Sequence, residues 1–276
     1  MINLTILAEN RANGNFAGQA GLSVLVNAFG NSLILDTGLS KLYTKNAKKA
    51  KINLKPIETV VLTHGHSDHT GGLCYLSKGK TIIAHPEIFR ARWSIRQQNY
   101  AGCPMSEKKM IKKHNFVPLT SAYKVFENCY FLGEIPMTVD FEKEGNFSTT
   151  LDDKFTQTDD TIDDSGIAIT TEKGLFVMTG CGHRGICNTI EHAKKVTGQN
   201  KLWGAFGGFH LRNLDKQKPV IDQTIQYFKD NDLQVLYLGH CVKDFVIDYF
   251  KQQLPNVKIE TLASGKQFDI DLNPLT

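Results

Sequence analysis

The sequence predicts an α/β protein with two sheets and outer helices. Short runs rich in β-branched residues alternate with amphipathic stretches along the whole chain. Both halves mix strands and helices in a similar order, and no linker separates them. Two sheets bury their apolar faces best when they pack face to face under outer helices. We therefore predict a single domain over residues 1–276 with this layered architecture.

The first half alternates expected strands with short helical segments. Gly30-Asn31 separates two apolar runs and is typical of a tight turn. Ser40 precedes a stretch of helical spacing and is a candidate N-cap. We expect strands at residues 2–7, 21–29, 31–38, 58–63, 80–85 and 124–135, and helices from residues 40 and 71.

Two segments interrupt this alternation. Residues 86–120 are basic and aromatic with little strand character, so we expect a helical insertion or lid. Residues 142–164 are polar and acidic, which indicates a loop. The cations of the insertion are Arg90, Arg92, Arg96, Lys108, Lys109, Lys112 and Lys113.

The second half repeats the alternation. Residues 166–180 are typical of a hairpin that turns at Glu172-Lys173-Gly174. Further strands are expected at residues 202–208, 233–239 and 257–262, with helices at 186–197, 216–230 and 243–253.

The composition narrows the class of protein. A net charge of +4 gives no reason to favour nucleic acid as a partner, and no apolar run reaches membrane-spanning length. The N-terminus lacks the basic and apolar regions of a signal peptide. The six cysteines are scattered without a CxxC pair, as expected for reduced thiols in a cytoplasmic protein.

Three histidines and a carboxylate follow the strand expected at residues 58–63. His64, His66, Asp68 and His69 cannot share one helical face at this spacing, but they fit a loop at a strand end. Imidazole and carboxylate groups together suit zinc, iron or manganese. We therefore predict that all four residues are metal ligands.

One loop does not complete a metal site. A catalytic zinc takes about three protein ligands, and a metal pair about 3.5–4 Å apart takes about six. Three later apolar strands each lead through glycine to a histidine, namely His183, His210 and His240. A buried structural histidine is the alternative for each of them.

At this point the motifs resemble a known family. "THGHSDHTGG" is similar to the HxHxDH signature of the metallo-β-lactamase fold superfamily, and "LILDTG", with Asp36, resembles its first motif. "GLSVLV", "GEIP", "TGCGHRGI", "GGFHL" and "GHC" resemble the subgroup named after 7,8-dihydropterin-6-yl-methyl-4-(β-D-ribofuranosyl)aminobenzene-5′-phosphate synthase.

The resemblance implies an αββα four-layer sandwich of two mixed sheets with two divalent metal ions at one edge. The ions would be zinc, with manganese or iron as alternatives. His64 and His66 would hold the first metal, and Asp68 and His69 the second. His183 and His210 would complete the ligand set, with His240 nearby as a supporting or acid–base group.

Several positions depart from the family pattern. Cys181 stands where most members carry a bridging aspartate, so either Cys181 ligates as a thiolate or His183 takes over as a ligand. Asp163 and Asp164 fall where the family has another histidine. Asp164 is therefore an alternative ligand to His183, and His240 an alternative to His210. Met137 replaces a subgroup arginine, and Val242-Lys243 replaces Thr-Gly, which removes groups that could contact an anionic substrate.

The leading functional hypothesis is hydrolysis of a small phosphoester or ester through a metal-bound hydroxide. Asp68 and His240 are the candidate catalytic residues, and the partner would be a small anionic molecule. The first alternative is the carbon–nitrogen bond formation of the subgroup's name, with the basic insertion contacting phosphates. The second alternative is a metal-containing protein that senses a ligand or binds a partner.

Overall fold

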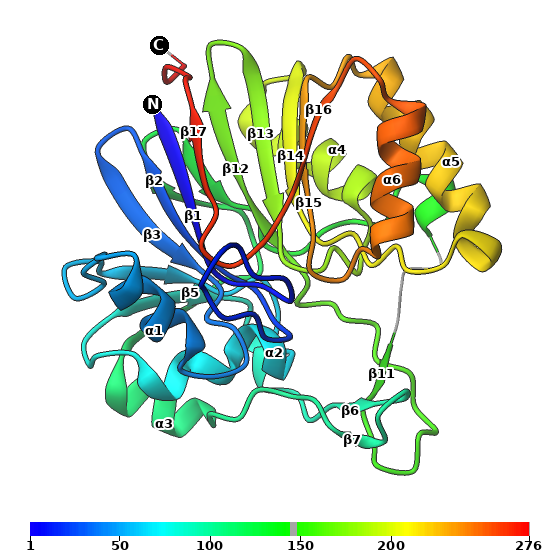
Figure 1. The fold of residues 1–276 in the computed structure, drawn as a ribbon. Coiled ribbons are helices and arrows are strands. Elements are labelled where there is room, and N and C mark those ends of the chain that lie inside the picture. Colours follow the sequence, from blue (N-terminus) through cyan, green and yellow to red (C-terminus); the bar gives the residue numbers. More distant parts are fainter. Residues whose placement is uncertain (144–147, 276) are drawn as a thin grey trace. The chain divides into compact units, whose positions relative to one another are not determined.

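A computed structural model describes residues 1–143 and 148–275 (Figure 1). The chain divides into two compact units. The first comprises Met1–Thr120, Phe147–Asp163 and Ala263–Asp271. The second comprises Ser121–Asn146, Asp164–Leu262 and Leu272–Thr276.

The first unit is built on a mixed seven-stranded sheet of order β17-β1-β2-β3-β4-β5-β8. Its strands are β1 (Ile2–Ala8), β2 (Ser23–Ala28), β3 (Asn31–Leu35), β4 (Thr59–Val61), β5 (Thr81–Ala84), β8 (Asn115–Pro118) and β17 (Gln267–Ile270). The pairs from β3 through β4 and β5 to β8 are parallel, and the others are antiparallel. The carboxyl ends of β3 and β4 therefore meet at one edge, which positions the loops that follow them.

Helices α1 (Leu42–Lys49) and α3 (Glu107–Lys113) belong to the first unit. Tyr43 and Ala47 of α1 and Met110 of α3 are buried in one apolar cluster with sheet residues such as Val60 and Ile82. At the carboxyl end of β4 the chain continues into the short helix α2 (Ser67–Thr70) and the 3₁₀ helix η1 (Gly71–Tyr75).

Residues 86–120, where we expected a helical insertion, contain one seven-residue helix, α3. They also contain η2 (Pro86–Phe89), β6 (Trp93–Ser94) and β7 (Asn99–Tyr100). Strands β6 and β7 form a small sheet with β11 (Thr149–Thr150), and β8 joins the main sheet. Of the loop expected at residues 142–164, positions 144–147 lie outside the described residues.

The second unit is built on a second mixed seven-stranded sheet, of order β16-β15-β14-β13-β12-β10-β9. Its strands are β9 (Tyr123–Phe126), β10 (Cys129–Phe131), β12 (Gly166–Thr171), β13 (Gly174–Thr179), β14 (Leu202–Gly207), β15 (Val235–Leu238) and β16 (Lys258–Thr261). The run from β13 to β16 is parallel. The carboxyl ends of β13, β14 and β15 therefore lie side by side.

Three helices cover this sheet: α4 (Ile186–Thr197), α5 (Leu214–Asp230) and α6 (Asp244–Gln253) (Figure 1). Ile190 of α4, Phe228 of α5 and Phe250 of α6 share one buried apolar cluster with Val177 and Ala205 of the sheet. The remaining short element is the 3₁₀ helix η3 (Asp140–Glu142).

The predicted α/β class with two mixed sheets and helices is confirmed. The hairpin turn at Glu172-Lys173 is also confirmed, since Thr171 pairs with Gly174. The first turn lies one residue earlier than expected, because Ala28 pairs with Asn31. Its central residues are Phe29 and Gly30, both with positive φ (52° and 83°), as a type I′ turn requires.

In the part of the chain that the structure describes, no helix is both long enough and apolar enough to cross a membrane.

Candidate metal centre

Asp36 and His64 follow the two adjacent parallel strands β3 and β4 at their carboxyl ends. Both side chains are fully buried. Asp36 adopts a left-handed backbone with φ of 56°, which an aspartate tolerates better than most residues. Such conformations persist where the surrounding structure fixes them, and they are concentrated at functional sites.

Asp36 orients His64 through Thr63. One carboxylate oxygen of Asp36 accepts the Thr63 N–H at 2.8 Å, and the other accepts the Thr63 hydroxyl at 2.8 Å. The hydroxyl has a single proton, so towards His64 Nδ1, 3.0 Å away, it acts as the acceptor. The network therefore assigns the ring proton of His64 to Nδ1 and leaves Nε2 as the basic nitrogen.

Asp36 orients His69 directly. His69 Nδ1 lies 2.7 Å from Asp36 Oδ2, and both side chains have no exposed surface. A carboxylate accepts, so His69 carries its proton on Nδ1 and Nε2 is basic. One buried carboxylate thus fixes the tautomers of two histidines, the arrangement that commonly supports metal-ligating imidazoles.

His66 is oriented by a separate chain of hydrogen bonds. Its Nε2 lies 3.1 Å from Thr149 Oγ1, and the Thr149 hydroxyl donates to Asp159 Oδ2 at 3.0 Å. Because Thr149 gives its proton to Asp159, it accepts from His66 Nε2–H. The basic nitrogen of His66 is therefore Nδ1.

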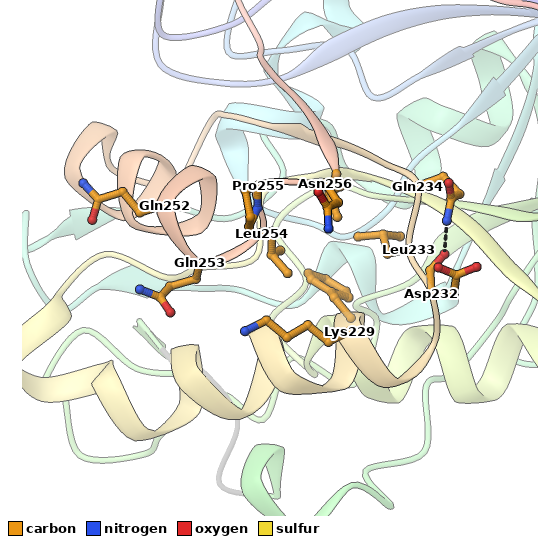
Figure 2. A pocket seen from close by; sticks show the side chains of 11 residues that line it. Lys229, Asp232, Leu233, Gln234, Gln252, Gln253, Leu254, Pro255 and Asn256 are labelled. Carbon is orange, nitrogen blue, oxygen red and sulfur yellow. Dashed lines mark hydrogen bonds between the residues drawn. The ribbon is translucent and has the colours of Figure 1, made fainter.

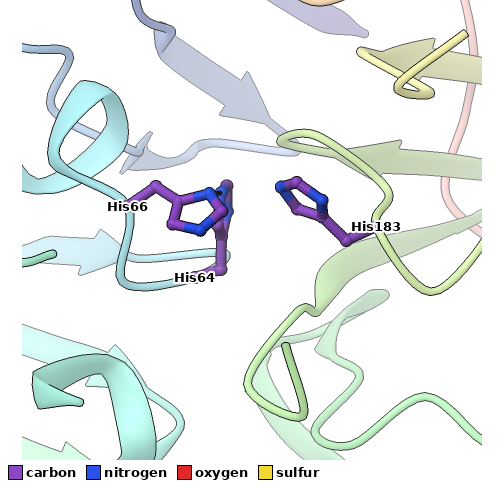
Figure 3. A group of neighbouring side chains, drawn as sticks. All are labelled: His64, His66 and His183. Carbon is purple, nitrogen blue, oxygen red and sulfur yellow. Dashed lines mark hydrogen bonds between the residues drawn. The ribbon is translucent and has the colours of Figure 1, made fainter. Parts of the chain in front are cut away.

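The basic nitrogens of His64 and His66 face one another. His64 Nε2 and His66 Nδ1 are 3.0 Å apart, and the ring centroids are 4.6 Å apart in an edge-on arrangement. Figure 3 shows these two rings on the loop after β4, and also His183, which the loop after β13 carries. Two nitrogen lone pairs at this distance repel unless a cation or a proton lies between them. The donor set of this loop therefore fits a metal ion.

Asp68 is the fourth predicted ligand of the loop. Its Oδ1 lies 3.9 Å from His69 Nε2, and its side chain is 31% exposed, unlike those of the buried histidines. An accessible carboxylate next to a buried imidazole suits either a ligand or a proton-transfer group.

Arg92 supports the same loop from the segment at residues 86–120. It is fully buried, and its Nε and Nη2 each bond a carboxylate at 2.6 Å, those of Asp159 and Asp163. Asp163 also accepts the Gly65 N–H at 2.8 Å. Burial raises the pKa of Asp163, and the Arg92 charge opposes that shift. Arg92 therefore has a structural role, because it joins two buried carboxylates. The expectation that it contacts substrate phosphates is wrong.

Gly65 is required by this close packing. A Cβ at residue 65 would lie 2.1 Å from the Ile88 carbonyl oxygen and 2.4 Å from Arg92 Nη1. The backbone between His64 and His66 can pass here only without a side chain.

The second unit carries the other sequence-predicted residues at the ends of parallel strands. Cys181 and His183 follow β13, His210 follows β14 and His240 follows β15. All four are buried. His210 and His240 both have left-handed backbones, with φ of 52° and 53°. The rings of His183 and His210 are 4.4 Å apart at their centroids.

Cys181 and His240 form a direct contact, with Sγ 3.1 Å from Nε2. Cys241 connects the loops that carry His210 and Cys181. Its Sγ accepts the His210 N–H at 3.2 Å and donates to the Cys181 carbonyl at 3.6 Å. Asp164 Oδ2 accepts the Arg184 N–H at 3.0 Å. All six cysteines of the chain are thiols in this structure.

A pocket of about 670 Å³ in the second unit lies away from these residues (Figure 2). It is formed at the ends of α5 and α6 and at the amino end of β15, by residues such as Lys229, Asp232 and Gln253. His240 follows the opposite, carboxyl end of β15. The pocket is therefore not part of the candidate centre.

Asp36 was expected from its motif to orient the metal ligands, but the other residues that orient the histidines were not predicted. Thr63 precedes His64 directly, and its position between a strand and a ligand was an available signal. Thr149 and Asp159 come from a loop of polar composition, in which no spacing distinguishes them from solvated residues.

This chain is similar to known proteins in sequence and in fold. Residues 18–102 match the family described as the metallo-β-lactamase superfamily. A Methanocaldococcus jannaschii protein named 7,8-dihydropterin-6-methyl-4-(β-D-ribofuranosyl)-aminobenzene-5′-phosphate synthase is 30% identical to this chain, over 96% of this chain and 95% of the relative.

Solved structures are similar to this chain over nearly its whole length. Tm1679, described as a metal-dependent hydrolase of the β-lactamase superfamily, aligns with a TM-score of 0.84 and 25% identity over 98% of this chain and 99% of its own. A diphosphatase from the PhnP family aligns with a TM-score of 0.55 and 14% identity over 100% of both chains, a likeness of fold alone.

The chain therefore belongs to the metallo-β-lactamase superfamily of enzymes, and its α/β fold of mixed sheets and helices is the fold of that superfamily.

Proposed function

We propose that the protein is a metal-dependent hydrolase of a small anionic phosphoester or ester. The proposed ligands of two divalent ions, zinc before manganese or iron, are His64, His66, Asp68, His69, His183 and His210. The observation that carries the proposal is the pair of basic nitrogens, His64 Nε2 and His66 Nδ1, held 3.0 Å apart.

A divalent metal, when bound, supplies a Lewis acid that activates water and polarises the bond to be cleaved. The residues of the chain orient the metal ligands and transfer protons. Asp36 holds His64 and His69 in the tautomers that present Nε2. We assign Asp68, the partly exposed carboxylate, to accepting a proton from the attacking water, and His240 to proton donation at the leaving group.

A second candidate is suggested by the methanogen relative, whose name denotes a synthase. By analogy, an aromatic amine would attack the methylene carbon of a pterin pyrophosphate, so that a carbon–nitrogen bond forms and pyrophosphate leaves. Met137 and Lys243 depart from the subgroup pattern at positions that could contact an anionic substrate. We therefore place hydrolysis first.

The test is an activity screen on purified protein reloaded with zinc, manganese or ferrous ion. We expect turnover of a generic phosphodiester or ester, such as bis(p-nitrophenyl) phosphate or p-nitrophenyl acetate. The His66→Gln variant should bind less metal and lose this turnover, and His192→Gln, on α4, is the matched control.

Two results would redirect the proposal. Pyrophosphate release that requires both a pterin pyrophosphate and an aromatic amine, without phosphoester turnover, would favour the synthase. Stoichiometric metal binding with no turnover of any of these substrates would favour a binding role.

A further inference from the structure

We propose that Cys181 is a thiolate metal ligand paired with His240, so that the centre has a soft donor at the position where the family resemblance implies a carboxylate. This inference rests on the proposed metal site and deepens it. It concerns the choice of metal as well as the identity of a ligand.

The geometry of the pair carries the inference. Cys181 Sγ lies 3.1 Å from His240 Nε2, and the donor atoms of Cys181, His240 and Cys241 all lie within 4.8 Å of one another. All three side chains are buried. A thiol and an imidazole nitrogen at this distance can approach the same ion after small rotations, and the thiol releases its proton to solvent when it binds. In this arrangement His240 is a metal ligand, its alternative predicted role, in place of the proton donor assigned above.

The backbone is built to bring these atoms together. Cys181 and His240 extend from β13 and β15, which flank β14 in the parallel sheet. At Gly208, in the loop after β14, a Cβ would lie 2.4 Å from Cys241 Sγ and 3.3 Å from His240 Cδ2. His240 has a left-handed backbone, with φ of 53°, and its ring lies beside Gly208. Strain of this kind at a ligand-type residue points to function.

Cys241 has a different role from Cys181. Its Sγ accepts the His210 N–H and donates to the Cys181 carbonyl, so it is committed to two neighbouring loops. We therefore assign Cys241 as a positioning residue and Cys181 as the ligand.

A soft thiolate changes which metals bind well. Thiolates favour zinc and softer ions, whereas carboxylates favour manganese and magnesium. A Cys181→Asp variant, which restores the usual carboxylate, should therefore shift preference from cadmium towards manganese. We expect the ratio of cadmium to manganese affinity to fall at least tenfold relative to the wild-type protein.

The experiment is cobalt and cadmium substitution of the full chain. Wild-type protein with Co²⁺ should show a thiolate-to-metal charge-transfer band in the near ultraviolet, and ¹¹³Cd NMR should show a sulfur-ligated ion. The band should disappear in Cys181→Ser and Cys181→Asp. It should remain in Cys241→Ser and in the exposed control Cys74→Ser.

The inference is overturned if wild-type protein holds cobalt without a charge-transfer band, or if the band survives in Cys181→Ser. The ¹¹³Cd measurement needs no variant, so a misfolded substitution does not leave the question open. Failure to bind any metal would instead contradict the proposed function, so the two failures are distinguishable.

Discussion

His66 Nε2 lies 3.1 Å from Thr149 Oγ1, and this contact links the histidine loop to a polar segment about eighty residues further along the chain. The Thr149 hydroxyl in turn donates a hydrogen bond to the Asp159 carboxylate, which is paired with the Arg92 guanidinium. The orientation of a predicted metal ligand therefore depends on side chains whose sequence context is that of an ordinary loop.

Removal of the Thr149 hydroxyl should weaken metal binding. Thr149→Val keeps the shape of the side chain but takes away the acceptor for His66 Nε2–H, so Nδ1 is no longer fixed as the basic nitrogen. We expect metal affinity to fall about 10- to 100-fold, the usual effect of losing such support. Chelator competition measures it.

Thr149→Ser is the matched control for this prediction, because serine retains the hydroxyl. It should keep wild-type affinity within a few-fold. Equal metal affinity in the valine and serine variants would show that the contact does not orient His66.

Asp36→Asn should have a comparable effect through two histidines. Asparagine also tolerates the left-handed backbone at this position, so the substitution tests the carboxylate rather than the fold. Thr63 Oγ1 and His69 Nδ1 both donate to Asp36 Oδ2, and the Thr63 N–H donates to Oδ1. The NH2 of asparagine cannot accept a hydrogen bond, so it faces either the two side-chain donors or the Thr63 N–H, and either choice disturbs the orientation of the histidines. We expect about a 10- to 100-fold loss of metal affinity. The exposed control Asp153→Asn should bind metal normally, and normal binding by Asp36→Asn would contradict the prediction.

Arg92→Met should destabilise the protein, whatever metal it binds. The variant leaves Asp159 and Asp163 buried without their shared cation. Breaking a buried ion pair in this way costs about 3–5 kcal/mol of unfolding free energy, which urea denaturation measures. Arg96→Met, at an exposed position in the same segment, should change stability by less than about 0.5 kcal/mol. A similarly small change in stability for both variants would argue against this structural role of Arg92.

Glu142 should make stability depend on pH. It is buried and accepts the Cys187 and Asn188 N–H groups at the start of α4, but burial raises its pKa from 4.5 to about 7. The folded protein therefore holds this proton more tightly than the unfolded chain does. The resulting stabilisation is complete below about pH 4.5 and is lost as the pH rises through about 7.

The measurement is urea unfolding at pH 5 and pH 8. The free energy of unfolding contributed by Glu142 should fall by an amount on the order of 2–3 kcal/mol from pH 5 to pH 8, since each pKa unit is worth about 1.4 kcal/mol. Glu142→Gln should not show this fall. Glu107→Gln, at an exposed position, should keep the wild-type pH dependence. A wild-type slope that is unchanged in Glu142→Gln would refute this role.

Much of this architecture could be predicted from periodicity and glycine placement. The strand–glycine–histidine pattern correctly placed His183, His210 and His240 beyond strands, because strand ends are local features. Strand β17 and the small sheet of β6, β7 and β11 were not predicted. Their pairing joins segments far apart in sequence, and strands of two residues carry no periodicity.

The candidate centre was predictable only in its ligand-type residues. Histidine density identified the loop from His64 to His69, and the family motifs pointed to Asp36. The orienting contacts of Thr149, Asp159 and Arg92 could not be read in advance, because they are long-range hydrogen bonds between residues of common types. The Cys181–His240 pairing depends on the order of strands in the sheet, which the sequence left open.

The most direct test of the central claim is elemental analysis of the purified protein beside a His64→Gln/His66→Gln double variant. We predict one to two equivalents of a divalent transition metal per wild-type chain and a loss of at least half of that metal in the double variant, with His192→Gln unchanged. A wild-type chain that takes up no metal after incubation with zinc, manganese or ferrous ion, or a double variant that retains the full amount, would contradict the account.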